Sequence, residues 1–208
     1  MRIGHVFSLS LFCVVFLLKA SLVQAKPVIL SLGDSLTFGL GVPTEKAWPA
    51  LLENKLKSDG FPQARVINAG SSGATTAFGI SALKFQLKRH KPDLVIYALG
   101  ANDGLRGIDP SSSYKNMEAV MEQLKAAGIK VLLLGMRAPP NYGDKFPKDF
   151  ASSFQKLADT YKVSFVPFFL EGVAGVPSLN QADGIHPNEK GYEKVLESIY
   201  PKVKELLL

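Results

Sequence analysis

The sequence predicts an α/β fold in which a five-stranded parallel sheet carries helices on both faces. Five short apolar segments alternate with five helical patterns, which is typical of parallel strands joined by helical crossovers. The segments are apolar almost throughout, as strands covered on both faces must be. The length of 208 residues, with 47% hydrophobic and 20% charged residues, suits a single globular domain.

Each predicted strand is an apolar run of strand length that ends at or before glycine, asparagine or proline. The strands are expected over residues 28–32, 65–68, 94–99, 129–134 and 163–167.

Each predicted helix has apolar residues three or four positions apart and a recognisable start or stop. Trp48, Leu52 and Leu56 share one face of the first helix, for example, and Gly60 ends it. The helices are expected over residues 44–59, 78–90, 110–127, 148–161 and 188–207. Residues 136–147 form a loop rich in proline, glycine and asparagine, and its length suggests a functional role.

Residues 1–25 have the pattern of a secretory signal peptide, which leaves residues 26–208 as the mature domain. Basic residues precede an apolar run over 6–18, and Val23-Gln24-Ala25 offers small residues at the usual cleavage spacing. The run is short for a membrane span, although an uncleaved anchor is the alternative. We therefore expect a periplasmic or secreted protein after cleavage near Ala25.

Composition excludes several classes of function. Cys13, the single cysteine, lies in the predicted signal peptide, so the mature chain offers no disulfide, thiol nucleophile or cysteine metal site. The net charge is +6, and two of the basic residues, Arg2 and Lys19, lie in the predicted signal peptide. The basic residues of the mature chain are scattered along the sequence. Without a basic stripe interleaved with aromatic residues, nucleic acid is not an expected partner. A weak attraction to anionic membrane surfaces remains open.

Polar and small residues follow the strands at the edge where the carboxyl ends of a parallel sheet meet. Ser35 follows the first strand, Gly73 the second and Asn102 the third, and Asp183 and His186 follow the fifth. Each has an ordinary interpretation as a helix cap or turn residue. Their shared edge favours a functional site instead.

These residue types suit acyl transfer. A serine hydroxyl needs a base, and His186 is the credible one, because His5 leaves with the signal peptide and His90 lies among basic residues at a helix end. Asp183, three residues before His186, can orient the ring, although an Asp-Gly turn with a capping histidine is the alternative. Backbone amides and an asparagine side chain can bind the developing oxyanion.

Four ordered blocks resemble the SGNH hydrolase superfamily, whose first block is the GDSL motif. The blocks are Gly33-Asp34-Ser35-Leu36, Asn68 to Thr75, Gly100-Ala101-Asn102-Asp103 and Asp183-Gly184-Ile185-His186-Pro187. The resemblance covers nearly the whole mature chain and is greatest to small secreted or periplasmic bacterial esterases with thioesterase, arylesterase and lysophospholipase activities. It implies a flavodoxin-like three-layer α/β/α sandwich.

The resemblance also implies roles for individual residues. Ser35 is the expected nucleophile, and Asp183 and His186 complete its triad. The backbone amides of Ser35 and Gly73 and the side chain of Asn102 form the expected oxyanion hole. Asp34 is expected to brace the site. The expected substrate-loop residues are Pro139, Pro140, Asn141 and Tyr142.

The expected activity is hydrolysis of short to medium acyl esters, thioesters or lysophospholipids through an acyl-enzyme. We expect a monomer that uses no metal and no cofactor. A carbohydrate O-acetylesterase of the same superfamily and a non-catalytic lipid or carbohydrate binder are the alternatives. Ala74 stands where close relatives often have an acidic residue, which bears on substrate preference.

Overall fold

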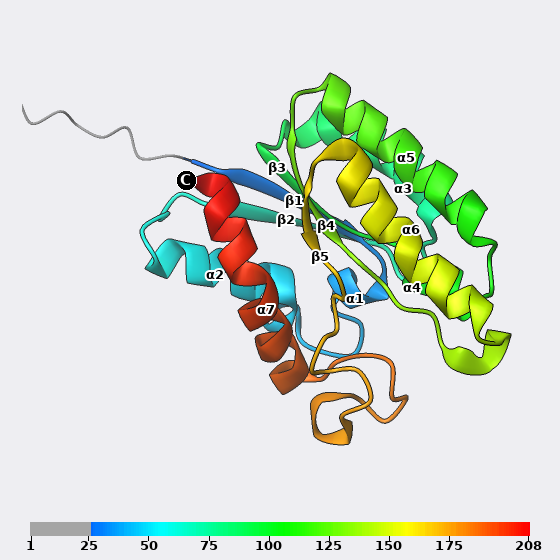
Figure 1. Cartoon of the computed structure of the whole chain (residues 1–208). Helices are drawn as coiled ribbons and strands as arrows, with labels where there is room; N and C mark the ends of the chain where they lie inside the picture. Colours follow the sequence, from blue (N-terminus) through cyan, green and yellow to red (C-terminus); the bar gives the residue numbers. More distant parts are fainter. Residues whose placement is uncertain (1–25) are drawn as a thin grey trace, which may run out of the picture.

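A five-stranded parallel sheet forms the middle of the molecule (Figure 1). The computed structural model describes residues 26–208, so the predicted signal peptide lies outside the described residues. The strand order is β2-β1-β3-β4-β5, the flavodoxin-like order, which confirms the predicted fold class. The strands are β1 (Val28–Gly33), β2 (Arg65–Gly70), β3 (Leu94–Ala98), β4 (Lys130–Leu134) and β5 (Ser164–Val166).

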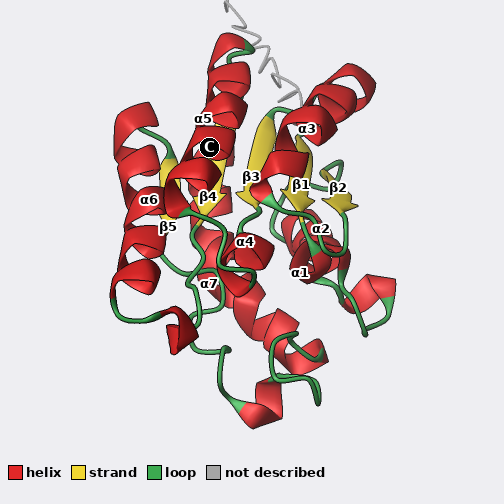
Figure 2. Ribbon diagram, turned by 90° about the vertical axis from the view of Figure 1, so that its right-hand side faces the viewer, coloured by secondary structure: helices red, strands yellow, loops and turns green. Residues whose placement is uncertain are grey.

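Helices cover both faces of the sheet, as Figure 2 shows. Two long helices pack together on one face, and three lie on the other. The first group is α2 (Trp48–Ser58) and α7 (Glu189–Leu207), and the second is α3 (Thr76–His90), α5 (Pro110–Ala126) and α6 (Lys145–Tyr161). Two short helices, α1 (Ser35–Phe38) and α4 (Ala101–Leu105), follow β1 and β3 at the carboxyl edge of the sheet.

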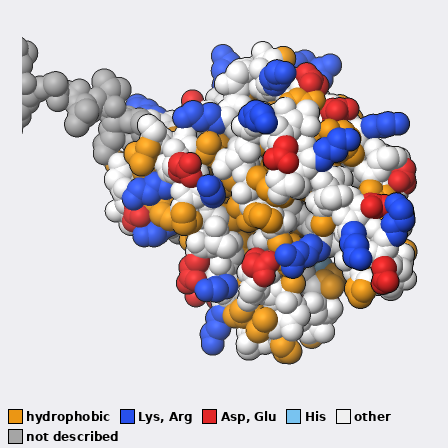
Figure 3. All heavy atoms as spheres, in the orientation of Figure 1, with side chains coloured by type: hydrophobic (Ala, Val, Ile, Leu, Met, Phe, Trp, Pro, Cys, Tyr) orange, Lys and Arg blue, Asp and Glu red, His pale blue; other side chains and the backbone are white. Residues whose placement is uncertain are grey.

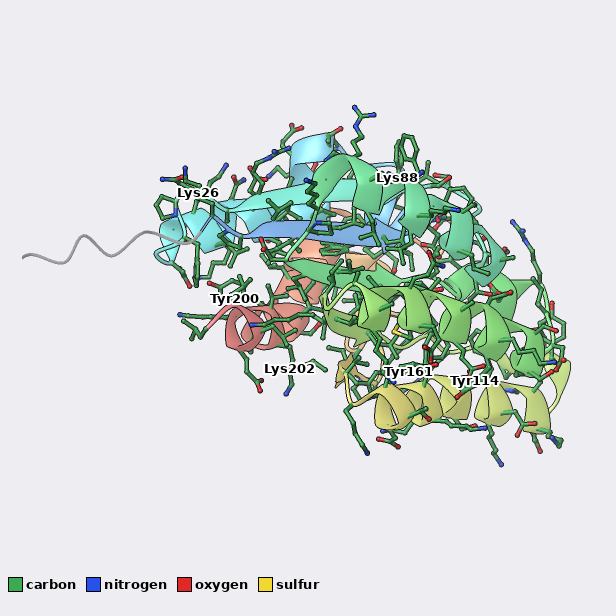
Figure 4. The ribbon with its side chains drawn as sticks, turned by 90° about the horizontal axis from the view of Figure 1, so that it is seen from above. Lys26, Lys88, Tyr114, Tyr161, Tyr200 and Lys202 are labelled. Atoms are coloured by element: carbon green, nitrogen blue, oxygen red, sulfur yellow. The ribbon has the colours of Figure 1, made fainter. Side chains whose placement is uncertain are left out.

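The core lies between the sheet and each helical layer. On one side the buried ring of Trp48 meets Phe169 edge-on, with 5.9 Å between ring centroids. On the other side Phe150 and Phe154 of α6 are fully buried and meet at 5.4 Å. Lys156 of α6 lies 4.8 Å from the ring centroid of Tyr114 of α5 and so links the two helices at the surface. Figure 4 labels Tyr114 on α5, beside α6.

The strand order places a switch point between β1 and β3. The chain runs from β1 outward to β2, then returns to the other side of β1 for β3, β4 and β5. Gly33 at the end of β1 is paired with Gly70 of β2 and Ala98 of β3, so these three strands end side by side. Open α/β sheets bind ligands in the crevice at such a point.

Four predicted boundaries differ from the structure by two residues or more. Strand β2 continues to Gly70, two residues beyond its predicted end, and the other three are helix starts. Residues Thr44–Lys46 form a separate 3-10 turn, because Pro49 favours a new helical start at Trp48. Helix α3 begins two residues earlier than predicted, where the carboxylate of Asp103 accepts from the Thr76 amide. Helix α6 begins at Lys145, so the predicted loop over 136–147 ends sooner, with Pro147 in the first helical turn.

The described surface carries mixed charge. On the face in Figure 3 basic and acidic side chains are interspersed rather than gathered into one stripe. Within residues 26–208 no helix is both long enough and apolar enough to cross a membrane.

Candidate active site

Ser35 lies in a tight turn between β1 and α1. Asp34 is the N-cap of α1, and its Oδ1 accepts a hydrogen bond from the Leu36 amide at 2.9 Å. The turn needs glycine at position 33, because a Cβ there would lie 2.0 Å from Thr37 Oγ1. The strand therefore turns sharply into the helix and leaves Ser35 as its first residue, 9% exposed.

The imidazole of His186 connects Ser35 with Asp183. His186 Nε2 lies 2.9 Å from Ser35 Oγ, and His186 Nδ1 lies 2.6 Å from Asp183 Oδ2. An ionised carboxylate only accepts hydrogen bonds, so Nδ1 carries the hydrogen and Nε2 is free to accept the serine proton. The structure thus brings together three residues that lie up to 151 positions apart in the sequence.

Hydrogen bonds hold Asp183 ionised. The bond from the His186 ring comes first, followed by the backbone amides of His186 and Ile185, and together they lower the pKa of Asp183 to about 2. The aspartate therefore stays charged at neutral pH and keeps the ring oriented. Its side chain is 45% exposed, so solvent screens much of its charge.

Two polar side chains that the sequence analysis did not single out hold the loop that carries His186. The Asn180 amide is buried and donates to the carbonyls of Val173 and Val176 at 2.6 and 2.8 Å. Gln181 Nε2 donates to Leu40 O at 2.7 Å, which ties this loop to the segment after α1. An Asn-Gln pair shortly before an Asp-Gly turn is the only signal that the sequence offers for them.

Burial dominates the electrostatics of Asp34, which lies directly beside the serine. Desolvation raises its pKa to about 6, and the Leu36 amide and the charge of His186 partly oppose this rise. Its second oxygen lies 3.5 Å from the side-chain nitrogen of Asn102. The predicted bracing residue therefore contacts both α1 and the asparagine of the predicted oxyanion hole.

The predicted oxyanion groups lie on a turn after β2 and on α4. Gly73 has a φ of +78°, a region that favours glycine, and the turn closes through the Ala74 amide to Ser71 O at 3.0 Å. Asn102 Nδ2 donates to Ala74 O at 3.0 Å, so one of its two hydrogens fixes the side chain against this turn. Its other hydrogen makes only the long contact to Asp34 Oδ2 at 3.5 Å, and an oxyanion that displaces this contact can engage it.

A cavity of about 450 Å³ opens beside Ser35 and His186 and is mostly apolar in lining. Gly73 and Asn102 line it as well, so four of the five predicted catalytic and oxyanion residues share one cavity, with Asp183 behind His186. The apolar part of the wall comes from residues that follow several different strands. Its members are Leu36, Leu40, Ala101, Leu105, Met136, Ala138, Pro139, Phe168, Leu170, Ala174 and Ile185.

The predicted substrate loop contributes less of this wall than expected. Pro139 lines the cavity, whereas Pro140, Asn141 and Tyr142 do not. The Tyr142 hydroxyl instead donates to Leu105 O at 2.8 Å and so fastens the loop to α4. The wall residues that the sequence analysis missed, such as Phe168 and Leu170, lie in the irregular segment after β5, where no periodicity marks them.

In the described part of the chain no group of three or more histidine, cysteine, aspartate or glutamate side chains is arranged to hold a metal ion.

Residues 31–194 match the family model described as the GDSL-like Lipase/Acylhydrolase family. The chain is 43% identical over 183 residues to the protein named Esterase TesA of Pseudomonas aeruginosa, covering 88% of this chain and 90% of that one. It is 39% identical over 178 residues to the Thioesterase 1/protease 1/lysophospholipase L1 of Escherichia coli K12, covering 86% and 82%. A crystal structure of TesA superposes with a TM-score of 0.82 at 42% identity, covering 86% of this chain and 99% of that one.

Proposed function

The chain belongs to the GDSL-like lipase/acylhydrolase family, and we propose that it is a serine esterase acting on carboxylic esters and thioesters of short to medium acyl chains. The observation that carries the proposal is the hydrogen-bonded series from Ser35 through His186 to Asp183 at the wall of an apolar cavity. The names of the relatives, an esterase and a thioesterase with lysophospholipase activity, support the same bond types.

The proposed reaction begins with attack of Ser35 Oγ on the acyl carbonyl carbon. His186 Nε2 takes the serine proton, and Asp183 stabilises the imidazolium that forms. The amides of Ser35 and Gly73 and the side chain of Asn102 bind the oxyanion. His186 then protonates the departing alcohol or thiol, which leaves the acyl group on Ser35. Water repeats the cycle with His186 as base and releases the carboxylic acid.

The cavity lining supports an acyl chain as the part of the substrate that is held there. Each methylene buried against such a wall contributes about 0.8 kcal/mol, which is roughly a fourfold gain in affinity. The polar side chains of the lining are few, and two of them, Ser35 and His186, are hydrogen-bonded to each other at the reacting end. This distribution favours an acyl ester over a carbohydrate O-acetyl ester as substrate.

The proposal includes export. Residues 1–25 have the signal-peptide pattern, and we expect a periplasmic or secreted enzyme whose first residue is Lys26. Amino-terminal sequencing of the protein recovered from the cell envelope or medium tests this. A chain that retains its first 25 residues there contradicts cleavage.

Hydrolysis assays test the activity. The purified protein is given p-nitrophenyl esters of graded chain length, acyl-CoA and lysophospholipid, beside the variants Ser35→Ala and Ser81→Ala. We expect turnover by the wild type and by Ser81→Ala, which changes an exposed serine on α3. Ser35→Ala is expected to lose about 10³-fold or more, because little catalysis survives without the nucleophile. A folded wild type that hydrolyses none of the substrates contradicts the proposal.

A further inference from the structure

We propose that Arg106 is a positioning residue of the oxyanion hole, because its guanidinium holds the carbonyl of Gly73. The inference rests on the proposed function. Arg106 follows the last residue of α4, and its Nη2 donates to Gly73 O at 3.1 Å. Gly73 lines the cavity, and its amide is one of the groups assigned to the oxyanion.

Three side chains of α4 and its C-cap, including Arg106, make hydrogen bonds to the segment 73–76. Asn102 Nδ2 donates to Ala74 O at 3.0 Å. Asp103 accepts from the Thr76 amide at 2.9 Å and from Thr76 Oγ1 at 2.5 Å. With Arg106 on Gly73, side chains from a five-residue stretch hold three positions within the segment 73–76.

Hydrogen bonds to α3 and α5 hold Asp103, one of the residues of α4 that contact the segment 73–76. Asp103 is 1% exposed and also accepts from Ser113 Oγ of α5 at 2.9 Å. Asn116 of the same helix donates to Thr76 Oγ1 at 3.1 Å. The middle of α4, which carries Asp103, is therefore fixed against α3 and α5, and Arg106 follows three residues later.

Gly73 is the position in the turn that most needs such a hold. It has no side chain that packing could fix, and its φ of +78° lies in a region that glycine leaves easily. A hydrogen bond on its carbonyl restricts rotation about the Cα–C bond. The guanidinium also bounds the glycine on its open side, since a Cβ there would find Arg106 Nη2 at 3.5 Å and no nearer heavy atom.

Among residues 26–208 no acidic side chain forms an ion pair that competes for the Arg106 guanidinium. The Arg106 side chain is exposed, so the single hydrogen bond adds little to folding stability. A substitution there should therefore leave a folded protein, and its effect should appear in the chemical step.

The test compares Arg106→Ala and Arg106→Lys with the wild type on a neutral p-nitrophenyl ester. We expect Arg106→Ala to lower kcat about tenfold or more with KM within about twofold, because displaced catalytic groups cost rate rather than ground-state binding. Lysine keeps a cationic donor without the planar fork, so Arg106→Lys should recover part of kcat. Added guanidinium should restore part of the rate of Arg106→Ala. Arg89→Ala, which removes an exposed arginine near the far end of α3, is the matched control and should keep wild-type kinetics.

The inhibition constant of a trifluoromethyl ketone distinguishes a role of Arg106 in the oxyanion hole from a purely structural role. The ketone adds to the serine as a tetrahedral oxyanion, so its inhibition constant should rise in Arg106→Ala by the factor that kcat/KM falls. Unchanged kcat beside an active wild type overturns the proposal and leaves the proposed function standing. A rise in KM confined to anionic acyl-CoA, with kcat unchanged, overturns it in favour of a substrate-binding arginine. A wild type without activity instead contradicts the proposed function and, with it, this inference.

Discussion

The substitution Asp34→Asn should remove a loss of stability that the wild type suffers between acidic and neutral pH. Asp34 is fully buried, and desolvation raises its pKa from 3.8 to about 6. The native protein therefore binds this proton more tightly than the unfolded chain does, and ionisation above that range weakens the fold. Asparagine is nearly the same size and keeps an oxygen to accept from the Leu36 amide, but it does not ionise.

The size of the effect follows from the shift. A rise of roughly two pH units corresponds to about 3 kcal/mol between the two protonation states. The neighbouring charges of His186 and Asp103 enter this shift with opposite signs, after burial and the Leu36 hydrogen bond. The free energy of unfolding of the wild type should therefore fall by about 3 kcal/mol relative to that of Asp34→Asn as pH rises from about 4 to about 7. Below about pH 4 the difference between the two free energies stays constant.

Urea unfolding of both proteins at several pH values measures this difference. Subtracting one plot of unfolding free energy against pH from the other removes the contributions of groups that both proteins share. Asp183 is one such group, and its pKa of about 2 also lies below the range from about pH 4 to about pH 7. Asp109→Asn is the control, because Asp109 is an exposed N-cap whose hydrogen bonds to Ser111 lower its pKa, so its difference should not change across this range. A constant difference for Asp34→Asn as well would refute the raised pKa and the burial that causes it.

The remaining predictions concern the oxyanion site, the cavity and a close approach in the fold. Asn102→Ala should lower kcat about 100-fold or more with little change in KM, measured by steady-state kinetics, and a raised KM with unchanged kcat would make Asn102 a ground-state binding residue. Ala174→Trp places a bulky ring at an exposed position of the cavity wall, so the optimum acyl length in a p-nitrophenyl ester series should become shorter, and an unchanged optimum would remove this wall from substrate selection. Gly70→Ala should cost about 3 kcal/mol or more in urea unfolding, because a Cβ there lies 2.2 Å from the Phe38 backbone nitrogen. A Cβ at Gly128 meets no other atom, so Gly128→Ala should lose only about 1 kcal/mol, through the strain of its positive φ. Equal losses of stability for the two variants would contradict the close approach of Gly70 to the Phe38 backbone.

The sheet and the catalytic edge could be predicted because their signals are local. Each strand is a short apolar run with a clear stop, and Ser35, Gly73, Asn102 and His186 each follow such a run. Parallel pairing then requires the strand ends to meet, which brings these residues to one edge without any knowledge of distances. The blocks resembling the SGNH superfamily add the roles.

The boundaries and the cavity wall could not be predicted because tertiary contacts set them. Helix α3 begins at Thr76 through a carboxylate 27 positions away in the sequence. Phe168 and Leu170 enter the wall from an irregular segment, whose path depends on buried hydrogen bonds of Asn180. The Tyr142 hydroxyl binds Leu105 O, a pairing that no sequence spacing indicates.

Covalent labelling tests directly whether Ser35 is an activated nucleophile. The wild type, Ser35→Ala and Ser81→Ala are treated with a fluorophosphonate, and the modified peptide is identified by mass spectrometry. Reaction at phosphorus requires an activated serine, and His186 Nε2 at 2.9 Å from Ser35 Oγ supplies the base. We expect one adduct per chain on Ser35 in the wild type and in Ser81→Ala, and none in Ser35→Ala. An unlabelled wild type, or a label carried by another residue and kept in Ser35→Ala, contradicts the assignment of Ser35 as the nucleophile.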